Sequence, residues 1–193
     1  VAILPACNPR HNAAAISAIE PRTSTSIGVF DPTGSKIATA AEDGTIRLWD
    51  AIADAPARPP LIERVGDFLS VAFGSDGRSL IAGNGEGEIH GWALPQGTPL
   101  FAPIRGAHTS DIWDLAVDPT NHVFATSSSD GKSILFSYPA GKVISLAVAP
   151  EDKIGGIAFS SDGKILFGGG ADGRVRLWDV TRGSLRSNTP IGH

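Results

Sequence analysis

Cysteine and methionine are nearly missing from this sequence. It contains one cysteine, Cys7, and no methionine among 193 residues. A single cysteine excludes an intramolecular disulfide and a cysteine-ligated metal cluster, and this usage fits a reducing compartment. The first six residues have no positive charge and no apolar run of signal-peptide length, so we expect a cytoplasmic protein. Because an initiating methionine is also missing, we interpret the chain as a fragment of a longer polypeptide.

An excess of basic charge and long apolar runs are also missing. Lysine and arginine total 16 against 20 aspartates and glutamates, which gives a net charge of −4 at pH 7. Nucleic-acid binders need a clustered basic face, so we expect no nucleic-acid partner. The longest largely apolar stretch, residues 143–149, has seven residues, whereas a membrane-spanning helix needs roughly 18 or more. With 41% hydrophobic and 19% charged residues, the composition is typical of a soluble globular domain with a sizeable core.

What the sequence does contain is an internal repeat. One short pattern, an acidic residue followed six positions later by an aromatic residue, occurs four times at steps of 43, 44 and 42 residues. The acidic column is Asp43, Glu86, Asp130 and Asp172, and the aromatic column is Trp49, Trp92, Phe136 and Trp178. A second column has the same steps: Phe30, Phe73, Val117 and Phe159. A period of about 40 residues indicates a blade or solenoid architecture.

The local composition between these columns favours strands. Short runs such as residues 36–40 and 69–73 are separated by Gly-, Pro-, Asp- and Ser-rich turns, and no helical pattern of ten residues occurs. The sequence therefore predicts an all-β fold of four-stranded antiparallel blades. A single blade cannot bury both of its faces, and radial stacking of such blades forms a β-propeller. We expect four blades here, as part of a seven- or eight-bladed ring.

The repeat spacing also predicts the domain organisation. A segment at 1–23 is expected to contain an outer or ring-closing strand, and 24–193 to contain the repeats. The four repeats are expected at about 24–66, 67–109, 110–152 and 153–191, with the start of a fifth at 192–193. His193 lies 85 residues after His108, which is about two repeat periods.

The repeats of this sequence resemble those of the WD-repeat family. Leu48-Trp49-Asp50 and Leu177-Trp178-Asp179 match the end of its repeat, and Gly106-Ala107-His108 is similar to its Gly-His opening. The resemblance covers about residues 24–193. It implies a propeller in which an opening His, a strand Ser or Thr, the turn Asp and the Trp form a buried hydrogen-bonded tetrad.

The expected tetrads are incomplete. The third repeat has His108, Thr126 and Asp130 but Phe136 in place of Trp, and the first has Thr39, Asp43 and Trp49 without the His. The second and fourth repeats are degenerate, with Ala82 and Gly168 at the Ser/Thr position. We predict a structural role for Asp43, Trp49, Trp92, His108, Thr126, Asp130, Asp172 and Trp178.

Catalytic and metal-binding interpretations compete with this structural one. The acidic column could be a ring of metal-binding carboxylates, but each member lies beside a glycine in a turn, where it accepts local backbone hydrogen bonds. His108 and Asp130 could be a base and its orienting acid, but no serine or cysteine lies in a nucleophile motif. We therefore expect no enzymatic activity, no metal and no cofactor.

The remaining candidates lie on loops, which carry function on rigid scaffolds. The resemblance implies a peptide-binding face at the loops that enter the first and third strands of each blade. Among its residues, Trp113 is the only tryptophan outside the structural column. Tryptophan is enriched at interface hot spots, although packing at the rim is the alternative. The candidate partner-binding residues are Glu42, Asp67, Leu69, Asp111, Trp113, Ser129 and Lys153.

Two functions follow from these observations. The leading hypothesis is a non-catalytic scaffold that binds a protein or peptide, basic or amphipathic in character, within a bacterial-type protein suggested by 11 arginines against 5 lysines. The alternative is an architectural half-propeller that forms a homo-oligomer through its exposed blade edges, closing an eight-bladed ring.

Overall fold

The computed structural model describes residues 25–41, 43–53, 55–56, 66–120, 122–148 and 154–190. These residues form four antiparallel sheets of four strands and no helix, so the prediction of an all-β fold with four-stranded blades is confirmed. Cys7, the segment 1–23 and residues 192–193 lie outside the described residues.

Each sheet is built from four strands that follow one another along the chain. The first blade has β1 (Thr25–Phe30), β2 (Lys36–Ala41), β3 (Ile46–Asp50) and β4 (Ala55–Pro56). The second has β5 (Phe68–Phe73), β6 (Ser79–Asn84), β7 (Ile89–Ala93) and β8 (Thr98–Pro99). The third has β9 (Ile112–Val117), β10 (Val123–Ser128), β11 (Lys132–Ser137) and β12 (Val143–Val148). The fourth has β13 (Ile154–Phe159), β14 (Ile165–Gly170), β15 (Arg174–Asp179) and β16 (Ser184–Pro190).

Side-chain hydrogen bonds fix the first turn of each blade. Asp31 Oδ1 accepts from the Lys36 amide at 2.7 Å, and Asp118 Oδ1 accepts from the Val123 amide at 2.8 Å. In the fourth blade the Ser160 hydroxyl accepts from the Ile165 amide at 3.0 Å. Such Asx- and Ser-type contacts favour tight turns over continued strand, which is why the chain reverses at the same point of each repeat.

The second turn of each blade requires glycine. The residue after the acidic column has a positive φ in all four repeats, from 71° at Gly173 to 80° at Gly131. Residues with a β-carbon rarely adopt this left-handed conformation. The acidic-Gly pair of the repeat is therefore explained by turn geometry.

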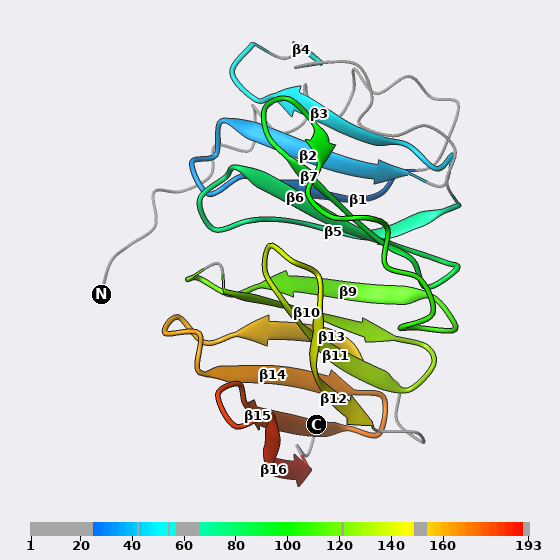
Figure 1. Ribbon diagram of the computed structural model, residues 1–193, viewed down its shortest axis with the longest axis vertical. Helices are drawn as coiled ribbons and strands as arrows, with labels where there is room; N and C mark the ends of the chain where they lie inside the picture. The colour runs from blue at the N-terminus through cyan, green and yellow to red at the C-terminus, as the bar shows by residue number, and fades with distance from the viewer. Residues whose placement is uncertain are drawn as a thin grey trace.

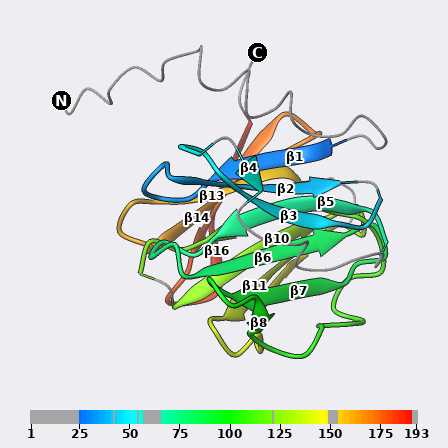
Figure 2. The same cartoon turned by 90° about the horizontal axis from the view of Figure 1, so that it is seen from above.

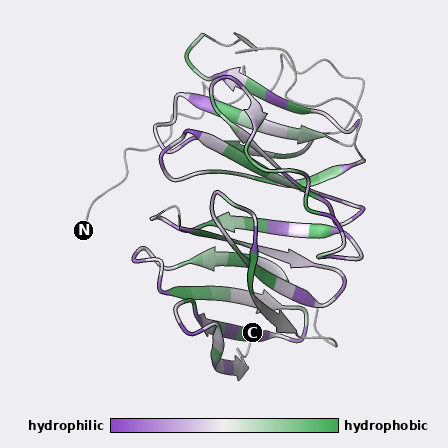
Figure 3. Cartoon of the chain, viewed as in Figure 1, coloured by the Kyte–Doolittle hydropathy of each residue, from purple (hydrophilic) through white to green (hydrophobic). Residues whose placement is uncertain are grey.

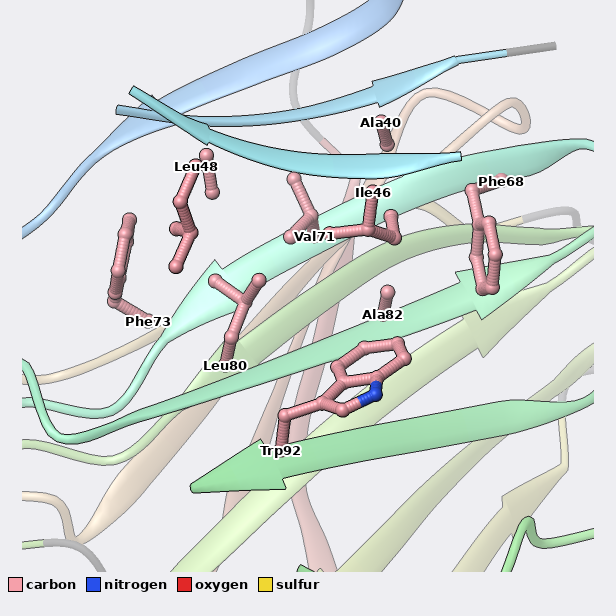
Figure 4. Packing of buried hydrophobic residues seen from close by; sticks show 10 residues of the cluster. Ala40, Ile46, Leu48, Phe68, Val71, Phe73, Leu80, Ala82 and Trp92 are labelled. Atoms are coloured by element: carbon pink, nitrogen blue, oxygen red, sulfur yellow. The ribbon is translucent and has the colours of Figure 1, made fainter. Parts of the chain in front are cut away.

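The blades stack face to face (Figure 1), and the sheets overlie one another when seen from above (Figure 2). Hydrophobic residues lie mainly in the strands and hydrophilic ones mainly in the turns (Figure 3). Separate apolar clusters form between blades 1 and 2, 2 and 3, and 3 and 4. In the first of these, Ile46, Leu48, Phe68 and Trp92 meet between β3 and β5–β7 (Figure 4). Burial of apolar area stabilises folding by roughly 25 cal/mol per Å², so these stacked interfaces stabilise the blades.

Candidate functional site

The predicted tetrad residues of the third blade are in contact. His108 Nε2 lies 2.7 Å from the Thr126 hydroxyl, and His108 Nδ1 lies 3.2 Å from both carboxylate oxygens of Asp130. The Asp130 carboxylate also accepts from the Thr109 and Lys132 amides, each at 3.0 Å. The network therefore joins the loop before β9 to β10 and to the β10–β11 turn.

Burial and hydrogen bonds together shift the pKa values of His108 and Asp130. Burial lowers the pKa of His108 despite the opposing charge of Asp130. Burial also raises the pKa of Asp130, but hydrogen bonds from Thr109 N, Lys132 N and His108 outweigh it and leave the pKa below the ordinary value. Phe136 has no donor to extend the network and instead stacks on Phe124, with ring centroids 4.8 Å apart. The network therefore holds the loop before β9 against β10 and the β10–β11 turn.

The other blades keep parts of this arrangement. In blade 1, Trp49 Nε1 donates to the Thr39 hydroxyl at 3.0 Å, and Asp43 Oδ1 accepts from the Thr45 amide at 3.0 Å. In blade 4, the Asp172 carboxylate pairs with the buried Arg176 guanidinium through bonds of 2.6 and 3.1 Å. Trp178 is buried and packs against Gly168, where an added β-carbon would lie 2.8 Å from its ring.

Blade 2 departs from the expected pattern. Asn84 Oδ1, two residues before the acidic column, accepts from the amides of Glu86 and Glu88 at 3.2 and 2.8 Å. The amide side chain of Asn84 thus fixes this turn in place of the carboxylate of Glu86. Trp92 is buried and stacks on His90, with ring centroids 6.0 Å apart.

A β-bulge lies at the same place in every blade. The pairing of the innermost strand with its neighbour skips one residue: Ser26, Leu69, Trp113 and Gly155 in blades 1 to 4. A bulge bends the strand and redirects the extra side chain. The family resemblance places this column at the loop face, and a bulge there gives the Leu69 and Trp113 side chains a direction that a regular strand would not give them.

Five candidate binding residues lie together at this end of blades 2 and 3. The Gly85 amide donates to the Asp67 carbonyl at 2.9 Å, and the Ser129 amide donates to the Asp111 carbonyl at 3.0 Å. A β-carbon added at Gly85 would lie 3.4 Å from Asp111 Oδ1 and 4.0 Å from Leu69 Cδ1. We call the surface formed by Asp67, Leu69, Asp111, Trp113 and Ser129 the acidic loop face. Glu42 and Lys153 lie outside the described residues.

Trp113 is the exposed centre of the acidic loop face. Its side chain is 48% exposed, and its indole Nε1 donates to the Ser129 hydroxyl. Asp67 is exposed, and Leu69, Asp111 and Ser129 are partly exposed. The hydrogen bond to Ser129 thus orients the indole while about half of Trp113 stays in solvent, on a face that also includes Asp67 and Asp111.

Asp114 is a residue that sequence reasoning missed. It is half-buried on β9, and its Oδ2 accepts from the Ile157 amide of the next blade at 2.8 Å. Burial raises the pKa of Asp114. No motif marks this position, because the contact joins residues 43 apart and exists only when blades 3 and 4 are stacked.

The described residues also bear on metal binding and on membrane insertion. No group of three or more His, Cys, Asp and Glu side chains in that part of the chain is arranged to hold a metal ion. That part also contains no helix long and apolar enough to cross a membrane.

The fold and the repeat together define a class of protein: β-propeller blades built from tryptophan-aspartate repeats. The family model for the WD domain, G-beta repeat, matches residues 10–50, 101–137 and 141–179. The chain therefore belongs to the WD40 family. Each match ends at or next to the end of a third strand, so the family's repeat is offset from the structural blade. Blade 2 falls between the matches, in keeping with Ala82 and Glu86 at its tetrad positions.

Similar proteins come from plants and animals. A plant protein from Arabidopsis thaliana described as "Cell division cycle 20.5, cofactor of APC complex" is 26% identical over 85% of this chain and 36% of its own length. Human Striatin-4 is 27% identical over 78% of this chain and 21% of its own length. Drosophila melanogaster Protein groucho is 26% identical over 72% and 20%. The chain spans about a third of the length of the plant relatives. These relatives are eukaryotic, which gives no support to the expected bacterial-type source.

Proposed function

We propose that this chain is a non-catalytic interaction scaffold that binds a basic or amphipathic segment of a protein partner on the acidic loop face. Membership of the WD40 family supports a scaffold, and one relative is described as a cofactor of a complex. The observation that carries the proposal is the half-exposed Trp113 indole, held by Ser129 on the same loop face as Asp67 and Asp111.

The chemistry of this surface suits a cationic side chain. A Lys or Arg over the face of an exposed tryptophan gains about 0.5–1 kcal/mol from the cation–π interaction. The carboxylates of Asp67 and Asp111 attract the same cation. Because the indole is already oriented by its hydrogen bond to Ser129, binding loses little side-chain entropy. An apolar residue beside the cation would contact Leu69.

The test is a binding screen with two matched sets of synthetic peptides. In one set Lys or Arg flanks an apolar residue, and in the other Glu replaces each basic residue. We expect the protein to bind members of the basic set. Trp113→Ala and Asp111→Asn should each weaken that binding by roughly tenfold or more, in the range of interface hot spots.

Asp76→Asn is the control, because it removes an exposed carboxylate at the opposite end of β5. This variant should bind like the wild type. Equal binding by the Trp113→Ala, Asp111→Asn and wild-type proteins would overturn the assignment of the site.

An exposed aromatic residue favours a second candidate function, ring closure by homodimerisation. Phe167 on β14 is 39% exposed, whereas the equivalent Ala38, Ile81 and Ala125 are fully buried. Light scattering should show a dimer for the wild type and a monomer for Phe167→Glu under this candidate. A wild-type monomer at high protein concentration would contradict it.

A further inference from the structure

The outermost strands of the four blades differ in how their free edges are protected. β4 and β8 have two residues each and end in Pro56 and Pro99. β16 is longer but carries Arg186 and ends in Pro190. β12 has six residues, VISLAV, with neither charge nor proline. Proteins usually shorten exposed edges or protect them with charge and proline, and β12 has none of these devices.

The outer edge of β12 is open within the described residues. β12 is the last strand of its sheet and pairs there only with β11. Its first two residues, Val143 and Ile144, are 57% and 52% exposed. The register with β11 shifts between Leu135 and Phe136, so Ile144 is the bulged residue of the edge.

The next blade extends this apolar edge. The Ser145 hydroxyl donates to the Gly183 carbonyl at 3.1 Å, which places β12 beside the β15–β16 turn. Leu185, two residues beyond Gly183, is also exposed. A small pocket opens at the same contact, lined by Leu135, Ser145 and Trp178, among others. An exposed strand edge beside an apolar pocket is the arrangement that β-augmentation uses, where backbone bonds give affinity and pockets give side-chain selectivity.

Basic residues border this edge, although the chain as a whole is acidic. Lys142 directly precedes Val143, and Arg186 directly follows Leu185; both are exposed and form no ion pair within the described ranges. The Arg182 side chain is 81% exposed, and its Nε lies 4.0 Å from Asp179 Oδ2. The charge complementary to this border is negative, opposite to that expected of a ligand of the acidic loop face.

We propose that the β12 edge, residues 142–148 with the adjoining Arg182–Arg186, is a second docking site that takes an extended segment of a partner protein. The segment adds a fifth strand to blade 3. It carries apolar residues at alternate positions, one of them directed to the pocket beside Ser145, and acidic residues at its ends, near Lys142 and Arg186. This site is separate from the acidic loop face, so either can bind without the other.

The probe is a panel of synthetic peptides with Val, Ile or Leu at three alternate positions and Glu at both ends. We expect saturable binding of members of this panel, measured by fluorescence anisotropy. Peptides with Lys at both ends, or with methylated backbone nitrogens on the pairing side, should bind at least tenfold more weakly. If no member of the acidic panel binds, or if backbone methylation has no effect, the proposal is overturned.

Two variants distinguish the edge from other exposed apolar residues. Ile144→Lys adds charge to the edge and should weaken peptide binding at least tenfold. Ile52→Lys makes the same change at an isoleucine that is 83% exposed in blade 1, and it should bind like the wild type. Thermal unfolding of both variants checks that the fold is kept. Equal binding by the two variants would contradict the proposal. Tight binding to anionic phosphatidylserine vesicles without peptide binding would assign the edge to a membrane surface instead.

Discussion

Two interfaces between neighbouring blades are built from equivalent positions with different chemistry. Between blades 1 and 2 the packed surface is mainly apolar, with the buried His90 against Phe68 and Trp92. Ala40 and Ile46 face each other there across β2 and β3. At the equivalent positions between blades 3 and 4, Ser127 and Ser133 face each other across β10 and β11. Both serine hydroxyls are buried, without a hydrogen-bond partner in the described part of the chain. The repeat pattern therefore fixes which positions lie between neighbouring blades. The residue at each of these positions decides how strongly the two blades interact.

The interface between blades 3 and 4 also contains charged groups. Asp114 is half-buried there, and the Arg176–Asp172 ion pair lies on the same side of blade 4 as Trp178. A buried hydroxyl without a partner costs roughly 1–3 kcal/mol. Both interfaces contain a tryptophan, Trp92 or Trp178, but the interface between blades 1 and 2 has Phe68 where blade 4 has the smaller Ile154. We therefore expect the blade 3–blade 4 contact to open first on unfolding.

The largest expected effect comes from removing Trp92. Trp92→Ala should lower the free energy of unfolding by about 3–5 kcal/mol, because it leaves a cavity in the apolar interface. Chemical denaturation measures this change. Trp113→Ala is the control, since Trp113 is half-exposed, and should change stability by less than about 1 kcal/mol. Equal losses would contradict the assigned roles of the two residues.

Exchanging residues between the two interfaces should have a smaller effect. Ala40→Ser places a buried hydroxyl without a partner in blade 1, as Ser127 does in blade 3. It should lower the free energy of unfolding by about 1–3 kcal/mol. The reverse change, Ser127→Ala, should be neutral or stabilise by about 1 kcal/mol. Urea unfolding of the two variants compares them directly. If Ser127→Ala destabilises as much as Ala40→Ser does, the serine hydroxyl has a partner and the comparison is wrong.

The smallest effect depends on pH. The pKa of Asp114 is raised above 3.8 by burial, so the folded state favours its protonated form. Ionisation of Asp114 therefore opposes folding as pH rises from 3.8 through its raised pKa. Asp114→Asn stays neutral and keeps an oxygen for the Ile157 amide. At neutral pH it should be more stable than the wild type, by on the order of 1 kcal/mol.

Urea unfolding as a function of pH tests the sign of this effect. The advantage of Asp114→Asn should disappear below the ordinary aspartate pKa of 3.8, where both side chains are neutral. A variant less stable than the wild type at neutral pH would show that ionised Asp114 stabilises the contact with Ile157.

Features that repeat along the chain were predictable from sequence. The strand pattern and the turns at Asp31 and Asp118 follow from residue types at fixed spacing. The replacement of Glu86 by Asn84 in fixing a turn was not predictable, because two nearby polar residues could both serve and only the folded geometry decides. Asp114 and the Ser127–Ser133 pair act only across stacked blades, so no local pattern marks them.

The candidate site likewise has one feature that was predictable from sequence and others that were not. Trp113 stood out as the one tryptophan outside the repeat column, and its exposure is visible only in the structure. Its hydrogen bond to Ser129 depends on the bulge in β9 and on the β10–β11 turn. Residue type alone does not specify either feature.

The most direct test of the acidic loop face is a nuclear magnetic resonance titration. The four tryptophans give separate indole N–H signals, and Trp113→Phe identifies the signal of Trp113. A peptide selected from the basic set should shift or broaden that signal while the buried Trp49, Trp92 and Trp178 change little. If the peptide binds and the Trp113 signal stays unchanged, the partner binds elsewhere and the proposed site is wrong.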